Sequence, residues 1–125
     1  MIKTTLHKNL QTTSEVTGKK VLATAFNEPR ADVNPGEMLA ASLGACMLTM
    51  VGFMASKHGD NAEGTSVEVR PQFDEKHSRI TGFELTFVFP ATFTQAQKEK
   101  YAKLAQGCPV HNSLREDMTY HVTVK

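Results

Sequence analysis

The chain has 125 residues, a length that suits one domain over residues 1–125 with a single core. Its 14 Lys and Arg residues nearly balance its 13 Asp and Glu residues, and no five like charges follow one another, so neither nucleic acid nor a membrane is expected as a partner. The N-terminus lacks the apolar stretch of a signal peptide, which predicts a cytoplasmic protein. Thiols are kept reduced in that compartment, so a disulfide between the two cysteines is expected only as a transient, catalytic one.

The first elements in the chain are predicted strands. Residues 2–26 alternate loosely between polar and apolar side chains and are rich in Thr and Val. Within them the run "VTGKKV" is typical of a hairpin, with its turn at Gly18.

A long helix follows, because the period of the apolar residues changes from about 2 to that of one helical face. The residues at this spacing are Leu39, Leu43, Cys46, Met50 and Phe53. Asn34 suits the N-cap, Pro35 the first helical position, and Glu37 the third, where its carboxylate can reach back to the cap amide. About 23 residues rising roughly 1.5 Å each give a rod near 35 Å long.

This helix is apolar nearly all round, so it needs cover on most of its sides. One sheet of about six strands would cover only one side. A second copy of the chain completes the cover, since the interface of an obligate dimer resembles a domain core cut in half. We therefore predict a homodimer.

The second half of the chain alternates strands and helices. The stretches 65–74 and 79–90 predict a hairpin with its turn at 74–78. Thr94 followed by Gln97 opens a helix as a capping box, and Gly107 stands where a C-terminal cap belongs. A short helix from Pro109 to about Glu116 and a strand over 119–124 complete an α+β fold, for which we expect an antiparallel sheet of about six strands. The face of the second hairpin strand that should be buried carries Phe83, Leu85, Phe87 and Phe89.

The two cysteines occupy different local settings. Cys108 precedes Pro109 at the start of a predicted helix, where unpaired amides and the helix dipole favour a thiolate, so we expect its pKa to be lowered. Cys46 lies in the middle of the long apolar helix, where burial would raise its pKa unless a cation or a hydrogen-bond donor comes from elsewhere. By itself, Cys46 would be interpreted as an inert core residue.

Two segments together resemble the OsmC/Ohr family of thiol-dependent hydroperoxide reductases. They are "NPGEMLAASLGAC", residues 34–46, and "CPVHNSL", residues 108–114. The resemblance implies the OsmC-like fold, α+β with a long cysteine-bearing central helix, as an intertwined homodimer with its site at the interface. It also implies that Cys46 attacks the peroxide and becomes a sulfenic acid, that Cys108 resolves it as a disulfide, and that a dithiol reductant of lipoyl type restores both thiols. No cofactor is implied.

The chain departs from the family pattern at the start of the helix. Family peroxidases place a glutamate directly after Asn-Pro, where this chain has Gly36, with Glu37 one position later. At about 100° per residue, Glu37 lies about 180° around the helix from Cys46, so a capping-box carboxylate is the favoured interpretation over the family's catalytic acid. The family's activating arginine has one candidate before the helix, Arg30. Arg30 and Glu37 remain candidate catalytic residues.

His111 follows Cys108 by three positions. This Cys-x-x-His spacing could supply half of a zinc site, but a structural site wants four ligands and the remaining histidines have no matching spacing. We favour a His111 near the thiol, able to donate to a thiolate or to take its proton, and expect no metal. The methionines of the long helix are core residues first, and as a second interpretation a soft wall for a hydrophobic substrate: Met38, Met47, Met50 and Met54.

The resemblance implies an enzyme: a thiol-dependent peroxidase of the organic hydroperoxide reductase type, an antioxidant stress-response protein acting on a small hydrophobic hydroperoxide. Two alternatives stay open. The first is a non-catalytic OsmC-fold protein that binds small molecules or thiol adducts, with the cysteines lining its pocket. The second is a zinc-stabilised interaction module.

Overall fold

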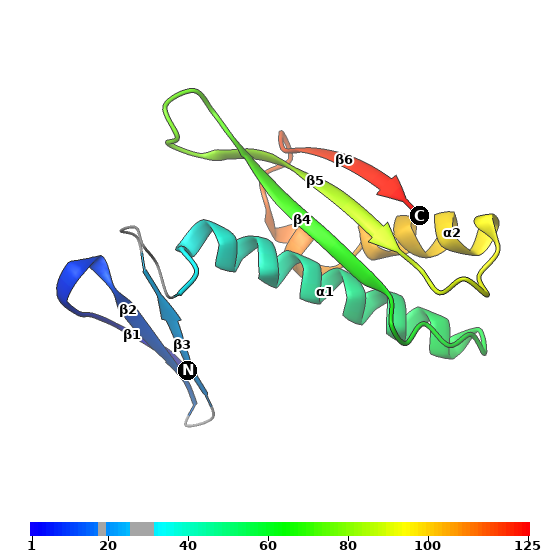
Figure 1. Cartoon of the computed structure of the whole chain (residues 1–125), viewed down its shortest axis with the longest axis horizontal. Helices are drawn as coiled ribbons and strands as arrows, with labels where there is room; N and C mark the ends of the chain where they lie inside the picture. Colours follow the sequence, from blue (N-terminus) through cyan, green and yellow to red (C-terminus); the bar gives the residue numbers. More distant parts are fainter. Residues whose placement is uncertain (18–19, 26–31) are drawn as a thin grey trace. The chain divides into compact units, whose positions relative to one another are not determined.

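A computed structural model describes residues 1–17, 20–25 and 32–125 (Figure 1). The chain divides into two compact units, Met1–Leu39 and Ala40–Lys125. The long helix α1 starts in the first unit and continues into the second.

The first unit holds a three-stranded antiparallel sheet in the order β1-β2-β3. A short 3₁₀ turn, Lys8–Leu10, joins the first two strands. Val16 pairs with Lys20, which confirms the predicted hairpin, whereas its turn residue Gly18 lies outside the described residues. The strands are β1 (Ile2–Leu6), β2 (Thr12–Val16) and β3 (Lys20–Thr24).

The second unit holds a second sheet, in the order β4-β5-β6. The hairpin of β4 and β5 is antiparallel, as predicted, but β6 pairs with β5 in parallel. The expectation of one antiparallel sheet of about six strands is therefore wrong: in the described ranges six strands divide between two sheets. The parallel pair arises because two helices cross over between β5 and β6, and a parallel return needs such a crossover. The strands are β4 (Ser66–Phe73), β5 (Ile80–Val88) and β6 (Thr119–Val124).

The helices begin at the predicted caps. At the start of α1 (Pro35–Lys57), the Glu37 amide donates to Asn34 Oδ1 at 2.8 Å, and the Asn34 amide donates to Glu37 Oε1 at 3.1 Å, which is a capping box. Thr94 and Gln97 form the same reciprocal pair at the start of α2 (Gln95–Ala105). The short helix α3 (Pro109–Ser113) ends before the predicted Glu116.

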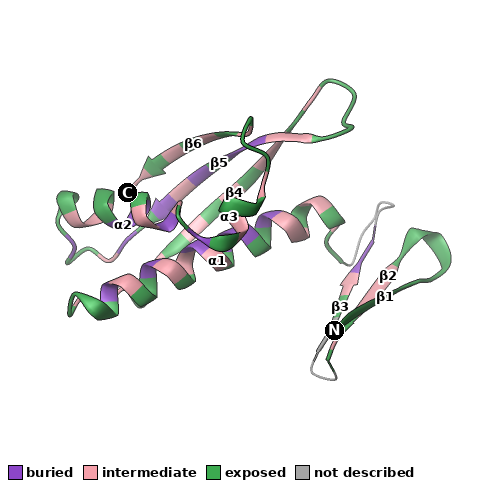
Figure 2. Cartoon of the chain, turned by 180° about the vertical axis from the view of Figure 1, so that it is seen from behind, coloured by how far each residue is buried: buried purple, intermediate pink, exposed green. Residues whose placement is uncertain are grey.

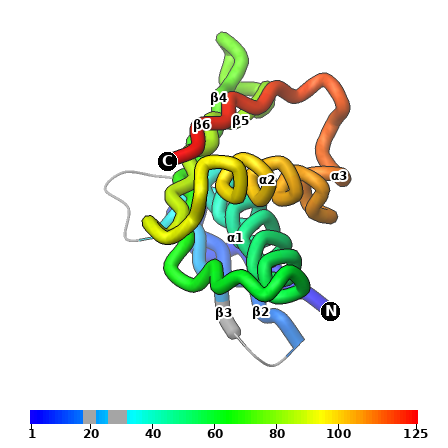
Figure 3. The backbone as a smooth tube through the Cα atoms, turned by 90° about the vertical axis from the view of Figure 1, so that its right-hand side faces the viewer, coloured from blue at the N-terminus to red at the C-terminus, as the bar shows by residue number. Residues whose placement is uncertain are grey.

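The core of the second unit lies between its sheet and its helices, which occupy the same side of the sheet (Figures 1 and 3). Buried residues follow β5 and one stripe of α1 (Figure 2). The predicted strand face is confirmed, since Phe83, Leu85, Phe87 and Phe89 are all buried. The helix packs closely on the sheet at Gly44 of α1, where an added Cβ would lie 3.2 Å from Val69 and 3.3 Å from Val67 of β4.

The stripe that α1 buries differs from the predicted one. Of the five predicted residues only Leu43 is fully buried, whereas Phe53 is 56% exposed. Because α1 is apolar nearly all round, spacing alone cannot select the face that meets the sheet. The buried residues are Ala40, Leu43, Gly44, Met47, Val51 and Ala55.

By length and composition α1 would also qualify as a membrane span, and 33% of its most apolar stretch is buried within the chain. A core helix passes the same test. One stripe of α1 is buried and contacts Val67 and Val69 of β4, which is typical of a core helix.

Candidate functional site

The two cysteines, 62 positions apart in sequence, meet in the second unit. Both are free thiols, and the Cys46 side chain lies close enough to Cys108 to raise the pKa of the Cys108 thiol. Cys46 comes from the middle of α1 and is half-buried, while Cys108 is the N-cap of α3 and is fully buried. The structure thus brings together two of the predicted site residues in one thiol pair.

The turn between α2 and α3 fixes Cys108. Its amide donates to the Ala105 carbonyl at the end of α2, at 3.2 Å. The Asn112 side chain donates to the Gly107 carbonyl at 3.1 Å, which closes the turn from the α3 side. Pro109 occupies the first position of α3, where its missing N–H costs no hydrogen bond.

Burial raises the pKa of the Cys108 thiol. The backbone N–H of His111, which donates to Cys108 Sγ at 3.4 Å, acts in the opposite direction, while the neighbouring Cys46 raises the pKa further. The expectation that the helix start would lower this pKa is therefore wrong. A helix of five residues offers few aligned dipoles, and the cost of desolvating a thiolate exceeds what they supply.

His111 joins the site through its ring as well as its backbone. The ring packs on Tyr120 of β6, with centroids 4.4 Å apart, and Tyr120 in turn stacks on Phe83 of β5 at 6.0 Å. His111 Nδ1 and the Tyr120 hydroxyl are both buried, and neither has a hydrogen-bond partner among the residues that the structure describes. Burial and the nearby Cys108 raise the pKa of Tyr120.

Tyr120 is a site residue that sequence reasoning missed. Its signal lies in the strand pattern, because Tyr120, Val122 and Val124 alternate with exposed residues and share one face of β6. What the sequence could not supply is the parallel register, which sets Tyr120 opposite Phe83.

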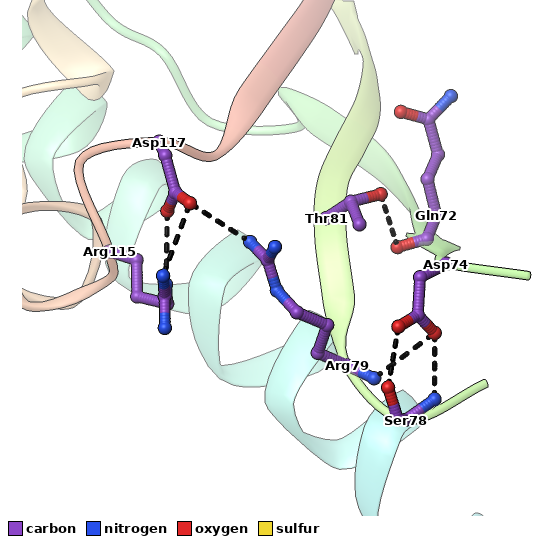
Figure 4. Close-up of polar contacts among 7 residues, drawn as sticks. All are labelled: Gln72, Asp74, Ser78, Arg79, Thr81, Arg115 and Asp117. Atoms are coloured by element: carbon purple, nitrogen blue, oxygen red, sulfur yellow. Dashed lines mark hydrogen bonds and ion pairs between the residues drawn. The ribbon is translucent and has the colours of Figure 1, made fainter. Parts of the chain in front are cut away.

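A cavity of about 280 Å³ opens beside this pair of rings. Near it, Arg115 donates to Asp117 at 3.0 and 3.2 Å, and Arg79 donates to the same carboxylate at 3.4 Å (Figure 4). These ion pairs join the loop before β6 to the end of the β4–β5 turn. The cavity is lined by His111, Asn112, Leu114, Arg115, Glu116 and Tyr120.

The other predicted site residues do not join the thiol pair in the described structure. Glu37 accepts the Asn34 amide in the capping box, and Arg30 lies outside the described residues. Within ranges 1–17, 20–25 and 32–125, no group of three or more His, Cys, Asp or Glu side chains could hold a metal ion.

Comparison with known proteins gives a family and a fold. A family model described as OsmC-like protein matches residues 28–123, whereas no curated protein sequence matches the chain. An osmotic stress and detoxification response protein of Psychrobacter arcticus superposes with a TM-score of 0.88 at 23% identity, covering 98% of this chain and 93% of that one. The OsmC-like protein of Mycoplasma pneumoniae superposes with a TM-score of 0.88 at 15% identity, covering 100% of this chain and 94% of that one. The organic hydroperoxide resistance protein OhrB of Bacillus subtilis superposes with a TM-score of 0.75 at 15% identity, covering 100% of this chain and 96% of that one.

Proposed function

The chain belongs to the OsmC-like protein family, and on that basis we propose that it reduces small organic hydroperoxides with Cys46 and Cys108 as its redox pair. The observation that carries the proposal is the closeness of the two free thiols, since Cys46 lies near enough to raise the pKa of Cys108. A disulfide needs the two sulfurs close together, and two distant segments of the chain supply that closeness here. The fold shared with a hydroperoxide resistance protein adds support.

The unequal burial of the thiols supports the assignment of their roles. Cys46 is half-buried, so a peroxide can reach its sulfur, whereas Cys108 is fully buried. The Cys46 thiolate attacks the hydroperoxide, breaks the O–O bond and releases an alcohol, which leaves a sulfenic acid on Cys46. Cys108 then displaces the sulfenic hydroxyl as water and forms the disulfide, and a dithiol reductant, of lipoyl type by family resemblance, reduces it.

Activation of Cys46 is proposed to differ from the family pattern. Gly36 carries no carboxylate where family peroxidases have one, and the Glu37 carboxylate accepts the Asn34 amide. Arg30 and Glu37 remain the candidates for an activating pair.

We further propose a homodimer of single-domain chains. Phe53 is 56% exposed on a helix that is apolar nearly all round, and a second copy of the chain would cover this exposed side chain. The solved relatives cover 98 to 100% of this chain, which supports one OsmC-like domain over residues 1–125. We also propose a cytoplasmic location with neither nucleic acid nor membrane as partner, and the near-neutral charge supports the absence of such partners.

A second candidate is a protein of the same fold that binds small molecules without catalysis. The cavity beside His111 and Tyr120 favours it, as does the buried thiol of Cys108 with its raised pKa. The zinc-stabilised module has no set of three ligands in the part of the chain that the structure describes.

Intact mass before and after one equivalent of cumene hydroperoxide, with zinc measured on the same sample, separates these functions. The peroxidase predicts a loss of two hydrogens as the disulfide closes, and recovery with dihydrolipoamide. A binding protein predicts an unchanged mass, and the zinc module predicts stoichiometric metal. An unchanged mass would contradict the proposed function.

A further inference from the structure

Two buried polar atoms beside the thiol pair are unused by the chemistry described so far. They are the hydroxyl of Tyr120 and Nδ1 of His111, on rings packed 4.4 Å apart. Buried polar groups normally have hydrogen-bond partners, and one left without a partner destabilises the fold. Two adjacent exceptions beside reactive groups therefore indicate a function in which both atoms acquire partners.

The surrounding structure holds both rings in place. Tyr120 lies opposite Phe83 in the parallel register and stacks on it at 6.0 Å. Asp117 holds the loop before β6 in place, because its carboxylate accepts hydrogen bonds from both Arg115 and Arg79 (Figure 4). His111 sits one turn from Cys108 and donates its amide to that sulfur at 3.4 Å. His111 and Tyr120 therefore both lie at the Cys108 end of the thiol pair.

Cys108 needs such groups in the second step of the proposed reaction. Its thiol is fully buried and keeps its proton, but only a thiolate attacks a sulfenic acid. The ionisable groups that face this cluster are Cys46 from α1 and, at the rim of the cavity, Arg115 and Glu116, while β5 contributes the Phe83 ring.

We propose that Tyr120 and His111 form a proton relay that serves Cys108 when the Cys46–Cys108 disulfide closes. The inference rests on the proposed function. As the Cys108 sulfur forms the S–S bond, its proton passes to the Tyr120 oxygen and the Tyr120 proton passes to His111 Nδ1. The S–O bond of the Cys46 sulfenic acid breaks, and its electron pair leaves with the hydroxyl, which takes up one proton from solvent and departs as water, while His111 returns the proton that it received to solvent. The Cys46 sulfur is reduced, the Cys108 sulfur is oxidised, and no further reactant is needed.

Single-turnover kinetics on the full-length protein test the relay. Tyr120→Phe removes the hydroxyl but keeps the ring that stacks on Phe83, and His111→Phe removes Nδ1 but keeps a ring against Tyr120. Matched controls are Tyr101→Phe, which removes the only other phenol, and His121→Gln on the exposed face of β6. With cumene hydroperoxide, dimedone capture follows sulfenic acid formation and intact mass follows disulfide closure.

In both relay variants we expect sulfenic acid to form within about twofold of the wild-type rate, whereas closure slows about tenfold or more. Closure in Tyr120→Phe should also rise about tenfold per pH unit below the thiol pKa, because the proton then leaves to solvent, while the wild-type rate levels off. In both controls the rate of sulfenic acid formation and the rate of disulfide closure should keep the ratio that they have in wild type. Unchanged closure, or equal slowing of both phases, would overturn the relay.

Diamide separates failure of the relay from failure of the proposed function. It activates a thiol without peroxide, and closure still requires Cys108 to lose its proton. If wild-type protein formed no sulfenic acid with cumene hydroperoxide, the peroxidase would fail, yet slower diamide closure in Tyr120→Phe than in Tyr101→Phe would still support the relay. Equal diamide closure in those two variants would overturn it.

Discussion

The two ends of the thiol pair differ in burial and in local structure. Cys46 sits in the middle of a 23-residue helix and is half-buried, while Cys108 caps a five-residue helix and is sealed from solvent. Around Cys108 the structure gathers a histidine, a tyrosine and a cavity, with ion pairs that fix the adjoining loop. The difference supports the proposed division of roles, in which Cys46 reacts with the substrate and Cys108 reacts only with the sulfenic acid that forms on Cys46.

The largest expected effect comes from removing the accessible sulfur. Cys46→Ser should abolish peroxide consumption, because a serine hydroxyl does not cleave the O–O bond at a useful rate. Cys108→Ser is the matched control and should still consume about one equivalent before it stalls. A coupled assay with cumene hydroperoxide and dihydrolipoamide measures both, and multiple turnovers by Cys46→Ser would reverse the assigned roles.

The Cys108 end should depend on the β5–β6 pairing. A Cβ added at Gly82 would lie 2.3 Å from the Thr119 carbonyl oxygen, so Gly82→Ala must push β6 away and should cost about 1–3 kcal/mol of unfolding free energy. It should also slow disulfide closure by displacing Tyr120. Urea unfolding measures the stability change. Gly52→Ala is the control, since no described atom beyond its chain neighbours and its own helix backbone lies within 4 Å of the added Cβ, and its stability should not fall.

The Cys46 end should respond to a carboxylate at the start of α1. Gly36→Glu restores the residue that family peroxidases carry, and we expect a several-fold faster peroxide consumption because the new carboxylate can orient a cation toward the thiol. The initial rate at limiting hydroperoxide measures this. Gly36→Gln has the same size without the charge and should leave the rate unchanged. If Gly36→Glu consumed peroxide at the wild-type rate, the missing carboxylate would not be what limits peroxide consumption by this chain.

A smaller effect follows from the raised pKa of Cys108. Because the unfolded chain loses this proton first as pH rises, folded stability should decline from the ordinary thiol pKa, about 8.5, up to the higher folded value. Melting temperature measured from pH 7 to 10 should therefore fall more steeply in wild type than in Cys108→Ser. If melting temperature fell equally steeply with pH in the two proteins, the burial of a protonated Cys108 thiol would be contradicted.

Local signals in the sequence predicted much of the fold. Side chains three positions apart define the capping boxes at Asn34 and Thr94, and the alternation in β5 identifies the buried face that carries Phe83. Long-range pairing could not be predicted. Nothing in residues 119–124 distinguishes a parallel from an antiparallel partner, so the division into two sheets and the parallel β6 required the structure.

The candidate site, like the fold, could be predicted from the sequence only where the signal is local. The motifs around Cys46 and Cys108 indicated both thiols, but the direction of the Cys108 pKa depends on how deeply the sulfur is buried, which a helix-start rule does not contain. Tyr120 became visible only when the register placed it on Phe83 and beside His111. The predicted stripe of α1 was wrong for a related reason, since a helix apolar nearly all round does not reveal which face its own sheet covers.

The most direct test of the redox pair is to locate the sulfenic acid. The two single variants, Cys108→Ser and Cys46→Ser, are each treated with one equivalent of cumene hydroperoxide in the presence of dimedone, and the adduct is mapped by peptide mass spectrometry. The account predicts an adduct on Cys46 in Cys108→Ser and none in Cys46→Ser. An adduct on Cys108 in the Cys46→Ser protein would contradict it.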